Sequence, residues 1–217
     1  MIRNTIARVD LAALRHNFAA IQQYLASEPG RTPPRIIAVV KANAYGHGAE
    51  RVALALEQAG ADVLACADIE EGIVLRRAGV RVPVLVFGAL SVSDLDGLFE
   101  YSLTPTISTP GAARAVQAAA ARKKTTIAYH LKIDTGMNRL GFRHDNLRRT
   151  LPELLASANL RLEAVYTHFA SADVPESPVF TDQRERFEAA WTVVGALTEP
   201  QTPNPGSLIP DQTPRLQ

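Results

Sequence analysis

The 217-residue sequence has one cysteine, no marked excess of charge of either sign and no long apolar run. The single cysteine, Cys66, excludes an intrachain disulfide and any multi-cysteine metal site, and its place in the apolar run DVLACAD predicts a buried, inert thiol. A formal net charge of +1 provides no basic excess that would attract nucleic acid. Charged residues interrupt the apolar runs, so we expect no membrane span, and residues 1–18 lack the apolar core of a signal peptide. These absences predict a cytoplasmic protein without nucleic-acid or membrane partners and without a metal site.

What the sequence does contain is a regular alternation of strands and helices. Apolar runs of strand type lie at residues 36–40, 62–65, 83–87, 103–107, 126–133 and 160–167. Helical patterns follow them at residues 48–60, 68–79, 93–99, 109–124, 145–156 and 177–197. Asp68 with Glu71 three residues later, and Thr109 before Pro110, are typical of helix starts. Apolar strands that alternate with helices indicate a parallel sheet covered by helices.

The alternation amounts to about six βα units, whereas a closed (β/α)8 barrel needs eight in about 250 residues. We therefore predict an α/β protein with a TIM-type barrel that is incomplete in this chain. Residues 11–197 would form the barrel portion, after a short strand within residues 1–10. In residues 198–217, five prolines and the lack of periodicity predict a disordered tail.

Three chemically capable residues each follow a predicted strand. They are Lys41, Arg139 in LKIDTGMNRLGF, and His168 in VYTHFASAD. In a barrel the carboxyl ends of the strands meet at one rim, so these side chains are expected to converge there. Each also has an ordinary interpretation, as a solvated loop lysine, a turn and a structural histidine. Their coincidence at one rim favours a site.

Two longer segments carry a family resemblance. AVVKANAYGHG, residues 38–48, resembles the pyridoxal phosphate attachment segment of the alanine racemase family, and LKIDTGMNRLGF resembles that family's substrate-binding segment. THFASAD and the opening RVDLAALRHN are similar to two further segments of the family. The resemblance covers residues 4–190 and implies a pyridoxal 5'-phosphate-dependent isomerase that interconverts L- and D-alanine for peptidoglycan precursors.

The resemblance also implies roles for individual residues. Lys41 would form the Schiff base with the cofactor and act as one of two catalytic bases, since an apolar strand end favours the neutral amine that attacks an aldehyde. Tyr45 would contact the cofactor phosphate, Arg139 the cofactor's phenolic oxygen and the substrate carboxylate, and His168 the pyridine ring. Lys132 would support Arg139. His47 receives no role beyond a loop hydrogen bond.

The family pattern continues beyond the segments found here. It implies two more βα units and a C-terminal β domain, with which the strand in residues 1–10 would pair. That domain would supply the second base across a homodimer interface. Without these parts we expect this chain to be impaired as a racemase. The alternatives are a stand-alone cofactor-binding barrel that maintains the pyridoxal phosphate supply without racemising amino acids, and a non-catalytic remnant.

Overall fold

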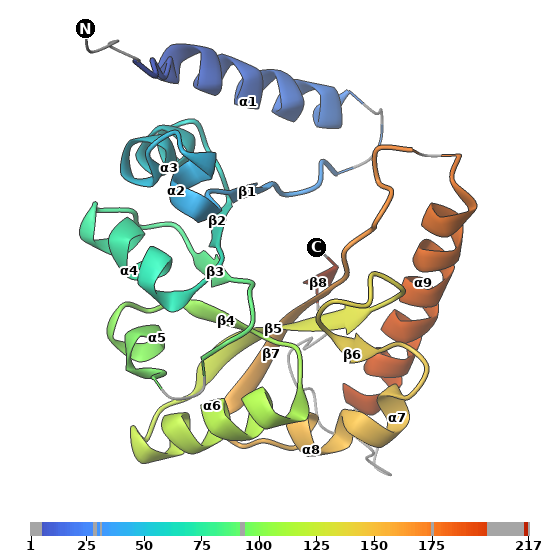
Figure 1. The fold of residues 1–217 in the computed structure, drawn as a ribbon. Helices are drawn as coiled ribbons and strands as arrows, with labels where there is room; N and C mark the ends of the chain where they lie inside the picture. Colours follow the sequence, from blue (N-terminus) through green and yellow to red (C-terminus); the bar gives the residue numbers. More distant parts are fainter. Residues whose placement is uncertain are drawn as a thin grey trace, which may run out of the picture. The chain divides into compact units, whose positions relative to one another are not determined.

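The computed structural model describes residues 6–27, 30, 32–91, 94–174, 176–198 and 215–216. The chain divides into two compact units. Unit 1 comprises Met1–Gly88 and Glu100–Leu103, and unit 2 comprises Ala89–Phe99 and Thr104–Gln217. Both units consist of parallel strands that alternate with helices (Figure 1).

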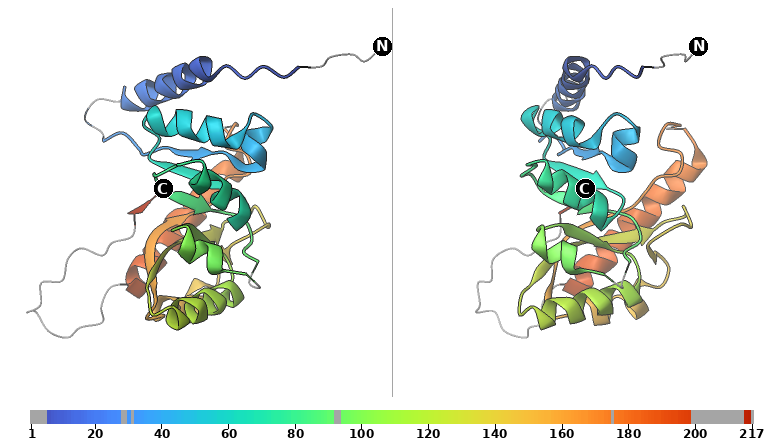
Figure 2. Two further views of the ribbon diagram at one scale, coloured as in Figure 1. Left: turned by 90° about the vertical axis from the view of Figure 1, so that its left-hand side faces the viewer. Right: turned by 60° about the vertical axis from the view of Figure 1, so that its left-hand side comes forward.

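Unit 1 is built on parallel strands. They are β1 (Ile37–Val39), β2 (Val63–Cys66) and β3 (Val84–Val86), paired in this order. The helices are α1 (Leu11–Ala26), α2 (Lys41–Tyr45), α3 (Ala49–Gln58) and α4 (Ile69–Arg77). α1 lies alongside α3 (Figure 2). Every residue of β2 and β3 is buried, as expected for parallel strands with continuous apolar sequence.

The core of unit 1 reaches the carboxyl ends of its strands. Val63, Ala65 and Leu85 form a buried cluster, and Ile37 and Phe87 pack against it. The ring of Phe87, directly after β3, is thereby held at the same end of the sheet as the residue that follows β1.

Arg76 forms hydrogen bonds with Glu100–Leu103, the segment of unit 1 that is distant from the rest of the unit in sequence. Its guanidinium donates hydrogen bonds to the carbonyl oxygens of Val80 and Val82, at 3.0 and 2.7 Å. It also donates to those of Tyr101 and Ser102, at 3.0 and 3.1 Å. These bonds explain why Glu100–Leu103 belongs to unit 1 although the preceding residues belong to unit 2.

Unit 2 contains the remaining strands and helices of the described chain. Its strands are β4 (Thr104–Ile107), β5 (Ile127–Asp134), β6 (Phe142–Arg143), β7 (Leu160–Tyr166) and β8 (Arg215–Leu216). β5 pairs with β4, β6 and β7, and β7 pairs with β8, all in parallel. The helices are α5 (Asp96–Glu100), which runs across the boundary between the units, α6 (Pro110–Arg122), α7 (Leu147–Thr150), α8 (Pro152–Leu155) and α9 (Pro178–Thr198).

The predicted alternation is confirmed, with local differences. All six expected strands are present, and the Asp68 and Thr109 side chains accept hydrogen bonds from the backbone N–H groups of Glu71 and Ala112 as helix caps. The helix expected over 145–156 is divided into α7 and α8 at Pro152, because proline has no N–H to continue the first helix.

The expectations for the two ends of the chain are largely untested. Residues 6–10 have no regular secondary structure, and residues 1–5, the rest of the predicted strand, lie outside the described residues. Of the predicted disordered tail, residues 199–214 and 217 also lie outside them, whereas Arg215–Leu216 forms β8.

Cys66 agrees with the expectation of a buried, inert thiol. The Cys66 thiol is buried, and burial raises its pKa to about 12, so it is protonated and unreactive at neutral pH. In the part of the chain that the structure describes, no helix combines the length and the apolar character that crossing a membrane requires.

Candidate functional site

Lys41 lies at the carboxyl end of β1, in unit 1. The ladder continues through buried Val40, whose N–H donates to Ala65 O at 2.8 Å, and Lys41 is the next residue. Its side chain is half-buried, and Nζ lies 5.6 Å from the ring centroid of Phe87 and 5.9 Å from that of Tyr45. Among the residues that the structure describes, Lys41 makes no ion pair with a carboxylate. The amine is therefore placed beside aromatic rings and is not neutralised by an acidic partner within that part of the chain.

A left-handed turn follows Lys41. Ala42, Asn43, Ala44 and Tyr45 have φ between 50° and 54°, a conformation that costs non-glycine residues about 1–2 kcal/mol each. Backbone hydrogen bonds from Ala44 N to Val40 O, at 2.9 Å, and from Gly46 N to Ala42 O, at 3.0 Å, close the turn. The turn thus directly follows Lys41 and contains the predicted phosphate ligand Tyr45, whose side chain is exposed.

Side chains from inside and outside the turn stabilise it. Glu71 of α4 accepts hydrogen bonds from Ala42 N at 2.6 Å and, through its other oxygen, from Ala67 N at 2.8 Å. Asn43 Oδ1 accepts from Ala49 N at 2.8 Å, at the start of α3. His47 Nδ1 lies 2.9 Å from Ala44 O, so its predicted loop hydrogen bond is confirmed.

Lys132 and Arg139 form a cationic group in unit 2, near the carboxyl end of β5. Lys132 is only 5% exposed, and its Nζ lies 4.5 Å from the ring centroid of Tyr166. Burial and the neighbouring positive charge of Arg139 lower the pKa of Lys132 to about 8, against the opposing influence of Asp134. Lys132 and Arg139 are therefore close enough for their charges to interact, and the supporting role of Lys132 stays a prediction.

Tyr166 of β7 provides the aromatic ring beside Lys132. Its hydroxyl lies 2.9 Å from Thr106 Oγ1 of β4, and burial raises its pKa to about 12 although the Thr106 bond and the charge of Arg139 lower it. Tyr166 is therefore protonated at neutral pH. It is not among the site residues predicted from the sequence, because a tyrosine at the end of an apolar strand reads as core.

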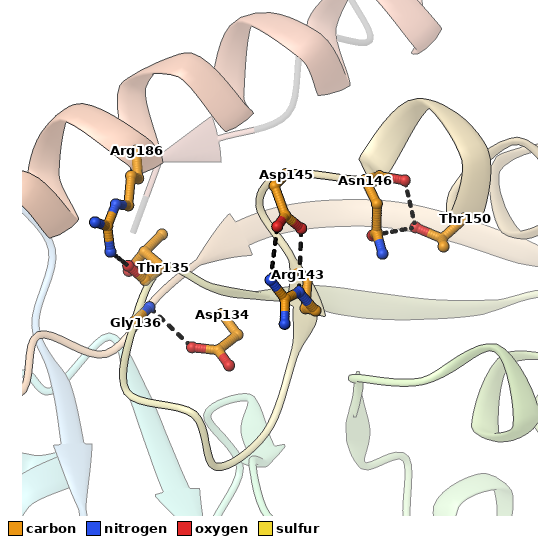
Figure 3. A network of polar contacts seen from close by, with 8 residues as sticks. All are labelled: Asp134, Thr135, Gly136, Arg143, Asp145, Asn146, Thr150 and Arg186. Atoms are coloured by element: carbon orange, nitrogen blue, oxygen red, sulfur yellow. Dashed lines mark hydrogen bonds and ion pairs between the residues drawn. The ribbon is translucent and has the colours of Figure 1, made fainter.

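The loop that bears Arg139 is short and tightly closed. Asp134 Oδ1 accepts a hydrogen bond from Gly136 N (Figure 3) and another from Asn138 N, each at 3.0 Å. The chain then returns through β6, which pairs with Ile133 and Asp134, and Gly141 allows the return with φ of 131°. Arg139 is exposed on this loop, so its guanidinium is accessible to a ligand.

His168 follows β7, in unit 2, and its loop is tied to that of Arg139. Thr167 Oγ1 donates to Ile133 O at 2.9 Å and lies 2.8 Å from Thr135 Oγ1. Gln183 of α9 donates to His168 O at 3.0 Å. Neither Gln183 nor Glu71 was predicted as a site residue. A glutamine in a helix is usually exposed, and the sequence indicates for Glu71 only a role at the start of a helix.

Lys41 and Tyr45 belong to unit 1, whereas Lys132, Arg139 and His168 belong to unit 2. The structure confirms that Lys41, Arg139 and His168 each follow a strand of a parallel sheet. Their convergence at one rim stays a prediction.

Comparison with known proteins identifies a consistent set of relatives. Residues 9–203 match the family described as alanine racemase, N-terminal domain. The alanine racemase of Carboxydothermus hydrogenoformans is 44% identical over 186 residues, which cover 86% of this chain and 49% of that protein. The chain spans about half the length of the curated relatives that it matches.

Solved structures agree with the sequence relatives. The alanine racemase of Clostridium difficile 630 in complex with cycloserine has a TM-score of 0.80 and 30% identity, and the match covers 87% of this chain and 51% of that one. The Bacillus anthracis alanine racemase with bound L-Ala-P has a TM-score of 0.75 and 35% identity, covering 86% and 48%. This likeness over about half of each chain confirms the predicted fold class, an incomplete TIM-type α/β barrel.

Proposed function

The chain belongs to the alanine racemase family through that family's N-terminal domain, and from this premise we propose that it is the lysine-bearing part of a pyridoxal phosphate-dependent racemase of L- and D-alanine. The observation that carries the proposal is the placement of Lys41. Its amine lies at the end of β1 beside the rings of Phe87 and Tyr45, on a turn that Glu71 holds in shape. A primary amine that has no carboxylate partner among the described residues is suited to react with an aldehyde.

The donor chemistry of the chain fits pyridoxal phosphate. When bound, this cofactor acts as an electron sink that weakens the bond between the substrate Cα and its hydrogen. Lys41 would bind the cofactor's aldehyde carbon, and Tyr45 would donate its hydroxyl to the phosphate. His168 would lie against the pyridine ring.

The cationic group of unit 2 fits an anionic substrate. Arg139 is exposed, and buried Lys132 carries a second positive charge close to it. The repulsion between these charges is relieved when a carboxylate or phenolate oxygen binds between donors, because a guanidinium can hold such oxygens in a planar fork. Arg139 would thus bind and orient the alanine carboxylate, and Lys132 would position Arg139.

Racemisation requires proton transfer on both faces of the substrate Cα. Lys41 would remove or return the proton on the face that serves D-alanine. The second acid–base group would be a tyrosine of the C-terminal domain that the family resemblance implies, supplied by the partner subunit of a homodimer. The whole protein would act in the cytoplasm and supply D-alanine for peptidoglycan.

Trapping the cofactor tests this proposal. The chain has four lysines, Lys41, Lys123, Lys124 and Lys132. After incubation with pyridoxal phosphate and reduction with borohydride, peptide mapping is expected to find the label on Lys41. Lys41→Ala should abolish it, whereas Lys124→Arg, a change at an exposed lysine, should not.

The outcomes separate the competing functions. Labelling of Lys41 together with conversion of L-alanine to D-alanine, in this chain or in one extended by a C-terminal domain, supports the racemase. Labelling of Lys41 without conversion in either form would favour a cofactor-supply protein. Preferential labelling of Lys132, the lysine with the lowered pKa, would contradict the assignment of Lys41.

A further inference from the structure

We propose that Gln183 is a positioning residue that fixes the loops after β5 and β7 relative to each other, and thereby sets where Arg139 and His168 meet the cofactor and substrate. This inference rests on the proposed function, because it concerns how the same site is held in shape. Gln183 lies near the start of α9 and does not itself reach a ligand, since only 1% of its surface is exposed.

The carboxamide of Gln183 makes three hydrogen bonds to the loops after β5 and β7. Its Oε1 accepts a hydrogen bond from Ala170 N at 2.8 Å. Its Nε2 donates to Thr135 Oγ1 at 3.1 Å and to His168 O at 3.0 Å. A buried amide is costly unless it is bonded in this way, so the three contacts constrain the side chain and the loops together.

The contacted residues lie next to the residues that the site needs. Thr135 begins the loop that bears Arg139, and the His168 carbonyl belongs to the candidate ring-contacting residue itself. Thr135 also bonds to Thr167, so the two loops are linked both directly and through α9.

A second residue of α9 supports the same loop. Arg186, three residues after Gln183, donates from Nη1 to Thr135 O at 3.1 Å (Figure 3). A side chain added at Gly136 would meet Arg186 Nη1 at 3.1 Å and Gln183 Cγ at 3.6 Å. The start of the Arg139 loop is therefore packed directly against α9, and a shift of Gln183 must move it.

The contacts at this position require a side chain that both donates and accepts hydrogen bonds. His168 O can only accept and Ala170 N can only donate, so the side chain between them must supply one acceptor and one donor. A glutamate has the same shape, but its carboxylate cannot donate to His168 O. Gln183→Glu therefore changes the hydrogen bonding with little change in volume.

Gln117 offers a matched control. It is a partly buried glutamine of unit 2, and its carboxamide donates to Asn159 Oδ1 at 3.1 Å and accepts from Asn159 N at 3.0 Å. Asn159 precedes β7, so these bonds lie at the opposite end of that strand from His168. Gln117→Glu disturbs a comparable pair of bonds away from the candidate site.

The experiment measures cofactor binding to the 217-residue chain. We expect Gln183→Glu to weaken pyridoxal phosphate binding about tenfold, the equivalent of losing one or two hydrogen bonds. It should also change the induced circular dichroism of the bound cofactor, which reports the orientation of the ring. Gln117→Glu should leave both unchanged even if it lowers the melting temperature equally.

A second variant covers the case in which Gln183→Glu does not fold. Thr135→Val is nearly isosteric and removes only the hydroxyl that Gln183 and Thr167 contact. It should alter the same circular dichroism signal in the same direction. Equal affinities and spectra for wild type and for the folded Gln183→Glu or Thr135→Val chain would overturn the inference.

This failure is distinguishable from failure of the proposed function. If pyridoxal phosphate labels Lys41 of the wild-type chain, but the Gln183 and Thr135 variants bind the cofactor with unchanged affinity and spectrum, only the positioning role is wrong. If the wild-type chain does not label at Lys41, the proposed function fails first.

Discussion

The carboxylate of Glu71 holds the residue next to the candidate catalytic lysine, because its Oε1 accepts a hydrogen bond from Ala42 N at 2.6 Å. Its second oxygen accepts from Ala67 N, directly after β2. One side chain of α4 thus joins the carboxyl ends of β1 and β2. Hydrogen bonds to an ionised acceptor are worth about 1.5–3 kcal/mol, enough to offset part of the cost of the left-handed turn.

Replacement of Glu71 by glutamine should loosen this turn. The glutamine NH2 group would face one of the two backbone N–H donors, and that bond would be lost. We expect faster amide exchange at Ala42 or Ala67 and less borohydride-trapped cofactor on Lys41. Glu70→Gln is the control, since Glu70 lies in the same first turn of α4 and is exposed. Similar behaviour of the two variants would contradict the role of Glu71.

Lys132 should make the stability of unit 2 depend on pH. Its pKa is about 8 in the folded chain and 10.5 as the ordinary value. Between these values the unfolded chain binds one more proton, so the free energy of unfolding rises with pH, by up to about 1.4 kcal/mol per unit. Below pH 8 both states are protonated and this contribution does not change.

Lys132→Met should lack this rise. Urea titrations at pH 7 to 10, followed by the fluorescence of Trp191, the single tryptophan and a residue of α9, would measure it. Lys124→Met, at an exposed site, should keep the wild-type pH dependence. Parallel curves for wild type and Lys132→Met would show that Lys132 keeps an ordinary pKa.

Two glycines of unit 2 should respond oppositely to alanine. At Gly141 a Cβ would lie 2.6 Å from Asp134 N and 2.8 Å from Ile133 C, with φ at 131°. We expect Gly141→Ala to lower the free energy of unfolding by about 1–3 kcal/mol. Gly195 lies within α9, and a Cβ added there would meet no neighbouring side chain within 4 Å among the described residues, so Gly195→Ala should raise it by about 0.5–1 kcal/mol. Trp191 fluorescence in urea measures both.

Asp134 should protect the Arg139 loop from proteolysis. Its Oδ1 accepts from Gly136 N and Asn138 N, so Asp134→Ala removes two bonds that fold the loop. Trypsin cleavage after Arg139 should become about tenfold faster, since proteolysis follows the population of the open loop. Asp173→Ala, at an exposed position outside this loop, is the control. An unchanged cleavage rate would show that the loop keeps its shape without Asp134.

Local sequence predicted most of the fold but not the details of the site. Asp68 and Thr109 start helices because their side chains bond to the backbone nearby, which a sequence pattern can show. The turn after Lys41 could not be predicted, because Ala42 and Ala44 rarely adopt positive φ and the stabilising Glu71 is 29 residues from Ala42. β6 was missed because a two-residue strand is defined by its pairing with β5.

Gln183 illustrates the same limit in unit 2. Its adjacent residues Asp182 and Arg184 are polar, and although Gln183 shares a helix face with buried Phe187, Ala190 and Val194, that periodicity does not show which groups its carboxamide contacts. Its hydrogen bonds follow from where the loops after β5 and β7 fold back onto α9. Contacts between segments that are distant in sequence decide which polar residues support a site, and such contacts leave no local pattern.

The left-handed turn has a consequence for how the chain discriminates among its own amines. Four non-glycine residues with positive φ cost about 4–8 kcal/mol together, comparable to the net stability of a small domain. The turn therefore exists only while β1, β2 and α4 are assembled around it. In the unfolded chain Lys41 is chemically equivalent to the other lysines, so selective modification of Lys41 would serve as a direct assay for native unit 1.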